Sequence, residues 1–216
     1  MMKQIAILQK YPEHVSAFLK FFYFVGIVGI FIPASSAFFI ALTPFALILS
    51  FGLLLLFHSK FDTNTYLTFL TIAILGFLIE ERGVNTGLIF GNYSYGDTLG
   101  FKIINTPIII GLNWLLMTYI SASVVEMFQI HTALKIISAS ILMVFYDLIL
   151  EQVAPLMNMW SWQNNMVPIQ NYVAWFVIAL VFQSVFKLRK IDTYNPMAAS
   201  VLIIQFVFFI TLLFFL

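Results

Sequence analysis

Long apolar stretches alternate with short polar ones along the whole of this chain. A helix that spans a membrane needs about 20 mostly apolar residues. The stretches that meet this requirement are residues 15–32, 36–57, 65–82, 107–128, 133–152, 168–187 and 196–216. They predict an all-α fold, a polytopic membrane helix bundle of about seven transmembrane helices in a single domain over residues 1–216. We expect a tight turn at 33–35 and a kink at Pro44.

Composition supports the membrane prediction. Of the 216 residues, 62% are hydrophobic and 9% are charged, whereas roughly 25% are charged in an ordinary soluble domain. So little charge cannot cover a water-soluble globule, and we expect a multi-pass integral protein of the cell membrane. The start of the chain resembles a signal peptide, with small residues at 34–37 after an apolar run. We expect this segment to be retained, because it completes a consistent topology.

The positions of Lys and Arg predict the orientation in the membrane. With a cytoplasmic N-terminus, only Arg82 and Lys102 face outside. The eight that then face the cytoplasm are Lys3, Lys10, Lys20, Lys60, Lys135, Lys187, Arg189 and Lys190. An odd number of crossings places Leu216 outside and makes residues 83–106 and 153–167 outer loops. These two loops, far apart in sequence, should therefore meet at one face of the membrane.

Charge and composition argue against several kinds of site. The net charge of +1 gives no indication of a nucleic acid partner. The sequence has no Cys, which excludes thiolate chemistry and disulfides. His14, His58 and His131 fall near expected helix ends without metal-ligand spacing, so we expect no metal site of the His type.

One face of the third expected helix combines small residues with a carboxylate. Residues three and four apart share a helix face, and the residues with this spacing are Gly76, Glu80, Gly83 and Gly87. Small residues allow another helix or a rigid ligand to approach closely. Because polar groups within membrane segments usually serve a function, Glu80 is a candidate site residue.

A second pair of carboxylates lies on the fifth expected helix. Asp147 and Glu151 are four apart and point the same way. Like charges this close repel and burial disfavours both anions, so at least one should hold a proton near neutral pH. A neutral carboxyl in an apolar site can donate that proton, as general acid catalysis requires. The alternative is a solvated or ion-paired carboxylate at a helix end, which we expect above all for Glu81 beside Arg82.

Aromatic and amide side chains accompany these carboxylates. Aromatic faces stabilise cations and would suit a site that forms a carbocation, although Trp residues also form interfacial belts. Amides in apolar helices either join helices or contact a ligand. The candidates are Tyr93, Tyr95, Trp114, Trp160, Trp162, Trp175, Asn85, Asn113 and Asn171.

The order of these motifs resembles a known family. The motif residues are Glu80, Gly83, Gly87, Phe90, Gly91, Tyr93, Tyr95, Leu99, Gly100, Pro107 and Trp114, then Asp147 to Glu151, Trp160, Trp162, Pro168, Asn171 and Trp175. Over residues 65–190 this string resembles the carotenoid biosynthesis protein family, which includes carotenoid 1,2-hydratases of the bisanhydrobacterioruberin hydratase type. Gln152 departs from the pattern, in which we expect Pro at this position; we expect the departure to concern the end of the fifth helix and to leave the carboxylates in place.

The resemblance implies a hydro-lyase that adds water across the terminal C1–C2 double bond of an acyclic carotenoid. An acid protonates C2, a tertiary cation forms at C1, and water captures it. For this reaction we expect Asp147 and Glu151 as acid and base, Glu80 as a third candidate, and the aromatic and amide candidates as substrate contacts. We expect no cofactor. The expected partners are a membrane-dissolved acyclic carotenoid, the lipid bilayer and other enzymes of the carotenoid pathway.

Other functions fit parts of the sequence. A retinal protein needs a Lys in the membrane, normally in its last helix, and residues 196–216 contain none. A carotenoid end-group cyclase would use the same protonation, with an alkene in place of water capturing the cation. A binder or transporter of apolar lipids would use the membrane-facing surface without chemistry. Product analysis with a lycopene-type substrate separates these alternatives.

Overall fold

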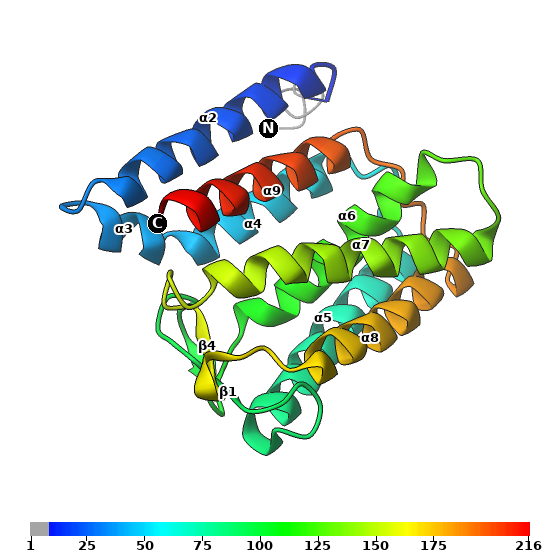
Figure 1. Cartoon of the computed structure of the whole chain (residues 1–216). Coiled ribbons are helices and arrows are strands. Elements are labelled where there is room, and N and C mark those ends of the chain that lie inside the picture. The colour runs from blue at the N-terminus through cyan, green and yellow to red at the C-terminus, as the bar shows by residue number, and fades with distance from the viewer. Residues whose placement is uncertain (1–8) are drawn as a thin grey trace.

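The computed structural model describes residues 9–216 and consists mainly of helices that run back and forth along one another (Figure 1). Its elements are α2 (Pro12–Phe31), α3 (Ser36–Ala41), α4 (Thr43–Leu56), α5 (Thr63–Thr86), β1 (Tyr93–Tyr95), β2 (Lys102–Ile103), β3 (Thr106–Pro107), α6 (Ile109–Glu126), α7 (Thr132–Val153), β4 (Trp160–Trp162), η1 (Gln163–Asn165), α8 (Ile169–Leu188) and α9 (Ala198–Phe215). The all-α prediction is confirmed. Lys3, which contributes to the predicted orientation, lies outside the described residues.

The second predicted helix, 36–57, is two helices in the structure. It breaks at Leu42, so that α3 ends at Ala41 and α4 begins at Thr43. Pro44 lies in the first turn of α4, where its missing N–H leaves no hydrogen bond within α4 unmade. Proline therefore starts a new helix here, and the expected kink becomes a complete break. The predicted tight turn between α2 and α3 is present.

Helix α6 lies at the centre of the bundle, between α5, α7 and α9. Fourteen of its 18 residues are buried, as expected for a helix that is apolar on all sides. Glycines bring α5 close to it. A Cβ built at Gly111 would lie 2.5 Å from the carbonyl oxygen of Ala73, so the two backbones are nearly in contact at this point.

The outer helices turn large apolar side chains outward, as a membrane protein does. Phe21, Phe24, Ile141 and Val177 are each more than half exposed. Helices α2, α6, α7, α8 and α9 are long and apolar enough to cross a membrane, whereas α4 is shorter. Helix α5 has 24 residues and is not among these five; its charged residues, Glu80, Glu81 and Arg82, lie near its C-terminal end. The structure thus supports a membrane protein.

Hydrogen bonds and ion pairs between loops and neighbouring helix ends hold several basic residues at one end of the bundle. The Ser59 hydroxyl donates to Asp192, and the Asn64 amide donates to the backbone carbonyl of Arg189 at 2.7 Å. At the same end Glu126 pairs with both Lys135 and Lys187. The segments that carry Lys60, Lys135, Lys187, Arg189 and Lys190 are therefore neighbours at this end of the bundle.

The two predicted outer loops meet at the opposite end, where they form a small antiparallel ribbon that the sequence analysis did not predict (Figure 1). Strand β1 lies between α5 and α6 in sequence, and strand β4 lies between α7 and α8. Their pairing connects segments more than 60 residues apart. The prediction that residues 83–106 and 153–167 come together is confirmed.

Candidate active site

The β1–β4 ribbon carries four aromatic side chains on one face. Successive side chains of a strand point to opposite faces, so Tyr93 and Tyr95 point one way while the serine between them is exposed. Trp160 and Trp162 alternate in the same manner. Tyr93 pairs with Trp162 and Tyr95 with Trp160, with ring centroids 4.9 and 6.0 Å apart. The four rings form an aromatic roof over the end of the helix bundle.

Glu80, near the end of α5, accepts three hydrogen bonds beneath this roof. The hydroxyls of Tyr93 and Tyr95 donate to Oε1, both at 2.5 Å, and Trp114 Nε1 donates to Oε2 at 3.2 Å. Burial, followed by the charge of the neighbouring Glu80, raises the pKa of Tyr93 and Tyr95 above the usual phenol range. Both phenols therefore remain donors. Three donors around one buried side chain suit a carboxylate.

Glu151, at the end of α7, lies under the other half of the roof. Its Oε2 accepts from Trp160 Nε1 at 3.0 Å and from Trp162 Nε1 at 2.5 Å, and its Oε1 accepts from Asn171 Nδ2 at 3.2 Å. The same Asn171 amide donates to Asp147 Oδ2 at 2.9 Å. The two carboxyl groups of α7 thus share one amide of α8, and the indole donors reach only Glu151.

Glu80 and Glu151 face a common cavity. Its lining comprises Glu80, Tyr93, Tyr95, Ile110, Asn113, Trp114, Glu151, Trp160, Trp162, Asn171 and Trp175. Ile110 is the one member of this set that the sequence motifs do not indicate, since it lies in an apolar run without any distinguishing neighbour. The free volume is about 20 Å³, and a single water molecule needs at least about 10–15 Å³ of such volume. The cavity therefore has room for about one water.

Trp114 and Trp175 build the inner wall of the cavity. Their rings are stacked with centroids 4.1 Å apart, and Trp114 is fully buried. A Cβ built at Gly76 would lie 2.6 Å from the Cβ of Trp114, so only glycine at this position leaves space for the indole. The small-residue face of α5 is thus occupied by side chains from within the protein, Trp114 at Gly76 and Phe90 at Gly83.

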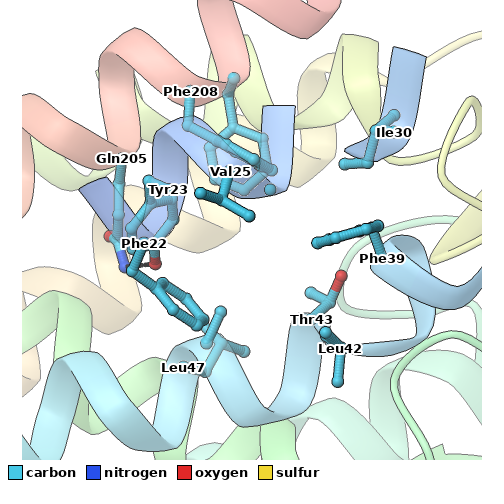
Figure 2. A pocket seen from close by; sticks show the side chains of 13 residues that line it. Phe22, Tyr23, Val25, Ile30, Phe39, Leu42, Thr43, Leu47, Gln205 and Phe208 are labelled. Carbon is cyan, nitrogen blue, oxygen red and sulfur yellow. Dashed lines mark hydrogen bonds between the residues drawn. The ribbon is translucent and has the colours of Figure 1, made fainter. Parts of the chain in front are cut away.

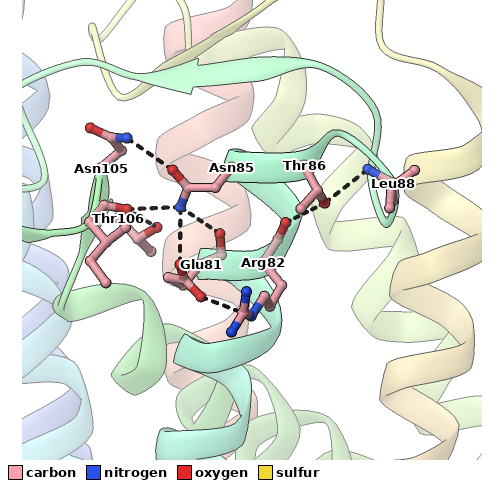
Figure 3. A network of polar contacts seen from close by, with 8 residues as sticks. Glu81, Arg82, Asn85, Thr86, Leu88, Asn105 and Thr106 are labelled. Carbon is pink, nitrogen blue, oxygen red and sulfur yellow. Dashed lines mark hydrogen bonds and ion pairs between the residues drawn. The ribbon is translucent and has the colours of Figure 1, made fainter.

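Asn85 and Glu81 belong to a separate polar network at the end of α5 (Figure 3). Asn85 Nδ2 donates to the backbone carbonyl of Ile104 at 3.0 Å, and its Oδ1 accepts from Asn105 at 2.9 Å. Glu81 pairs with the exposed Arg82 at 3.5 Å, as expected. Asn85 does not line the cavity. Its amide instead fastens the loop before α6 to α5, so the prediction that Asn85 belongs with the other candidates at one cavity is wrong.

Asp147 is the second predicted residue that the structure places outside the cavity lining. It is completely buried behind Asn171, and within residues 9–216 its Oδ1 has no hydrogen-bond partner. Spacing along α7 correctly put Asp147 and Glu151 on one face, but only the residue nearer the ribbon reaches the cavity. Asp147 can therefore act on a bound molecule only through Glu151 or Asn171.

The arrangement can move a proton onto an apolar molecule and stabilise a positive charge there. Two carboxyl groups from different helices face one cavity, and six aromatic rings surround it. Asn113 also lines it, and its side chain makes no hydrogen bond within residues 9–216, which leaves an amide to bind a small polar molecule. Among the described residues no group of His, Asp and Glu is arranged to hold a metal ion.

Comparison with known proteins identifies the family. The model of the carotenoid biosynthesis protein family matches residues 37–216. This range extends beyond the motif region on both sides and includes α4, α9 and all residues that line the cavity. A search of curated proteins and a search of solved structures each gave no match. The chain belongs to the carotenoid biosynthesis protein family.

Proposed function

We propose that this protein is a carotenoid hydratase, a hydro-lyase that adds water across the terminal C1–C2 double bond of an acyclic carotenoid. The observation that carries the proposal is the cavity lined by aromatic side chains together with Glu80 of one helix and Glu151 of another. Hydration needs an acid, a base, one water and protection of a cation from other nucleophiles. In this proposal residues of this chain act as the acid and the base and shield the cation, and the cavity has room for the water.

Glu151 is the proton donor in this proposal. Asp147 and Glu151 are one helical turn apart and share the Asn171 amide, so the pair carries a single proton rather than two adjacent charges. Of these two, only Glu151 lines the cavity. Within residues 9–216 its Oε1 accepts one hydrogen bond, which leaves that oxygen able to carry the proton. Asp147 is a positioning residue that shares the proton from behind.

Glu80 is the proton acceptor. Its three donors stabilise the carboxylate form, and no second carboxyl group lies on its own helix face. The proton of Glu151 bonds to C2 of the alkene and leaves a cation at C1. The oxygen of water bonds to this cation. The surplus proton of that water then passes to Glu80. One water is consumed, and return of the proton from Glu80 to Glu151 through a further water restores the site.

Product analysis tests this function. Lycopene is added to the purified protein in lipid vesicles. The pigments are then separated, and their molecular masses are measured by mass spectrometry. Hydratase activity gives a product heavier by one water. An isomer of unchanged mass with a ring at its end would show a cyclase, and unchanged lycopene bound to the protein would show a binder; either result would overturn the proposal.

We further propose that the chain crosses the membrane seven times with a cytoplasmic N-terminus. The clustering of Lys60, Lys135, Lys187 and Arg189 at the end opposite the ribbon supports this orientation. Reporter fusions at residue 60 and at 187–190 should report the cytoplasm, and a fusion after Leu216 should report the outside. A cytoplasmic reporter at Leu216 would show that one of the helices does not cross.

A further inference from the structure

A polyene bound at the Glu80–Glu151 cavity cannot be contained in it. The cavity has a free volume of only about 20 Å³, so the long apolar remainder of the substrate must lie elsewhere against the protein or in lipid. Two hollows on the bundle offer an apolar surface for it. One lies between α2, α4 and α9, and the other lies between α5 and α6.

The first hollow, here called the α2–α9 groove, has a cavity volume of about 90 Å³ (Figure 2). Apart from Tyr23, Thr43 and Gln205, its lining is apolar, with phenylalanines from α2, α3 and α9. Val25 lies in the groove and is 37% exposed, so the groove reaches the outer surface of the bundle where lipid would be. Residues 22–30 of α2 border it over about 12 Å at 1.5 Å per residue.

A smaller hollow lies between this groove and the cavity lined by Glu80 and Glu151, here called the carboxylate cavity. It has a free volume of about 20 Å³ and shares Thr43, Leu47 and Phe209 with the α2–α9 groove. On its other side it shares Ile110, Asn113 and Trp160 with the carboxylate cavity. The three hollows are therefore adjacent in series, from the outer surface to the cavity that Glu151 lines, and each is separated from the next by side chains that line both.

The α5–α6 hollow has no such connection. It is larger, about 330 Å³, and apolar, but it shares no lining residue with the carboxylate cavity. Its floor is the contact in which Gly111 of α6 touches the backbone of α5 at Ala73. Because two helix backbones close this floor, movement of a side chain cannot open it toward Glu80.

We propose that the α2–α9 groove binds the apolar polyene chain of the substrate. The end group then passes Thr43, Leu47 and Phe209 into the smaller hollow, and from there passes Ile110, Asn113 and Trp160 into the carboxylate cavity. This inference rests on the proposed function for the identity of the ligand, an acyclic carotenoid. The groove is lined by side chains that bury hydrocarbon without requiring any polar partner. The polyene enters from the membrane, and only its end meets the carboxyl groups.

Protection of an introduced thiol by bound lycopene tests the groove without any measurement of hydration. The chain has no Cys, so Val25→Cys and Ile74→Cys each introduce a single thiol, the first in the α2–α9 groove and the second in the α5–α6 hollow. Both positions are exposed enough to react with a maleimide. Lycopene should slow alkylation in Val25→Cys at least about tenfold, and it should leave Ile74→Cys unchanged. Protection of Ile74→Cys alone, or of neither thiol, would overturn the proposal.

A pair of glycines supplies a second test. A Cβ built at Gly26 meets only Phe208 Cε2, at 3.7 Å, and points into the groove; at exposed Gly52 of α4 a Cβ meets nothing within 4 Å. Both positions therefore accept a side chain without displacing the backbone. Gly26→Phe should weaken lycopene binding at least about tenfold, which is about 1.4 kcal/mol, whereas Gly52→Phe should not. Equal binding by the two variants would contradict the groove.

These tests separate the groove from the chemistry. Lycopene that protects Val25→Cys but yields no hydrated product would support the groove and refute the hydratase. Hydrated product formed at the normal rate by Gly26→Phe would support the hydratase and refute the groove. Repeating the protection in a Val25→Cys, Glu151→Gln double variant should give the same result, because binding precedes proton transfer.

Discussion

Glu151→Gln removes the proposed proton donor while keeping the shape of the side chain. The neutral amide has no proton to transfer to an alkene, and loss of a general acid typically lowers a rate by about 10²–10⁴-fold. We expect a loss in this range for the formation of hydrated lycopene. The variant should still bind lycopene, since the α2–α9 groove is unchanged.

The structure also gives the cost of this substitution in stability. Glu151 accepts hydrogen bonds from two indoles and from Asn171. A glutamine has only one acceptor oxygen, which can serve the two indoles at Oε2. Its NH₂ group then faces the Asn171 NH₂ group, and one buried donor loses its acceptor, which costs about 1–3 kcal/mol. The melting temperature should fall, but the protein should remain folded below it.

The assay compares initial rates per folded protein in vesicles, together with thermal unfolding in detergent. Glu81→Gln is the matched control, because Glu81 is also on a helix near the ribbon end yet pairs with Arg82 outside the cavity. It should keep a rate near that of the wild type. A near-normal rate in Glu151→Gln would refute the assignment of the donor and would make Glu80 the leading candidate.

Three further predictions concern other parts of the molecule. Asp147→Asn should also slow hydration, but less than Glu151→Gln does, because Asp147 does not line the cavity; the ratio of the two rates in one assay checks this. Gly76→Ala should destabilise the protein by about 1–3 kcal/mol by pushing against Trp114, whereas Gly52→Ala should leave the midpoint of denaturant unfolding the same or higher. Asp62 accepts a hydrogen bond from the backbone N–H of Thr65 in the first turn of α5. This hydrogen bond is the largest of the causes that lower the pKa of Asp62 from 3.8 to about 2. The stability that this hydrogen bond provides is present above about pH 4 and is lost as the pH falls toward 2. The difference in melting temperature between the wild type and Asp62→Ala should therefore vanish over that range. A constant difference would contradict the role of Asp62 as the N-cap of α5.

The apolar pattern predicts the helices well because membrane helices are specified largely by continuous hydrophobicity. The predicted range 133–152 differs from α7 by one residue at each end. The range 65–82 ends too early, because the charged run at 80–82 looked like a membrane boundary. Helix α5 instead continues to Thr86 and ends where Gly87 adopts a left-handed conformation with φ of 67°. A glycine C-cap was visible in the sequence and was the better boundary signal.

The ribbon was the main feature that sequence analysis missed. Tyr-Ser-Tyr and Trp-Ser-Trp alternate with the period of two that a strand requires, and this signal was present at 93–95 and 160–162. Each run is only three residues long, too short to predict a strand alone. Their pairing depends on the helices that bring both loops to one end of the bundle, and no local pattern encodes that arrangement.

The candidate site was predicted in composition but not in geometry. Ten of the twelve candidates line the cavity. Asp147 does not, because helical spacing fixes which residues share a face but not how far along the helix that face meets a cavity. Asn85 does not, because its amide is hydrogen-bonded to the loop before α6. Both outcomes depend on tertiary packing.

Isotope incorporation measures the central chemical claim most directly. The purified protein is given lycopene in deuterated water that also carries heavy oxygen, and the product is examined by mass spectrometry with fragmentation. Proton donation by a carboxyl group that exchanges with water, followed by capture of the cation by water, predicts deuterium at C2 and heavy oxygen at C1 of the same molecule. Deuterium without heavy oxygen would show that an alkene captures the cation, and a product with neither label would contradict the account altogether.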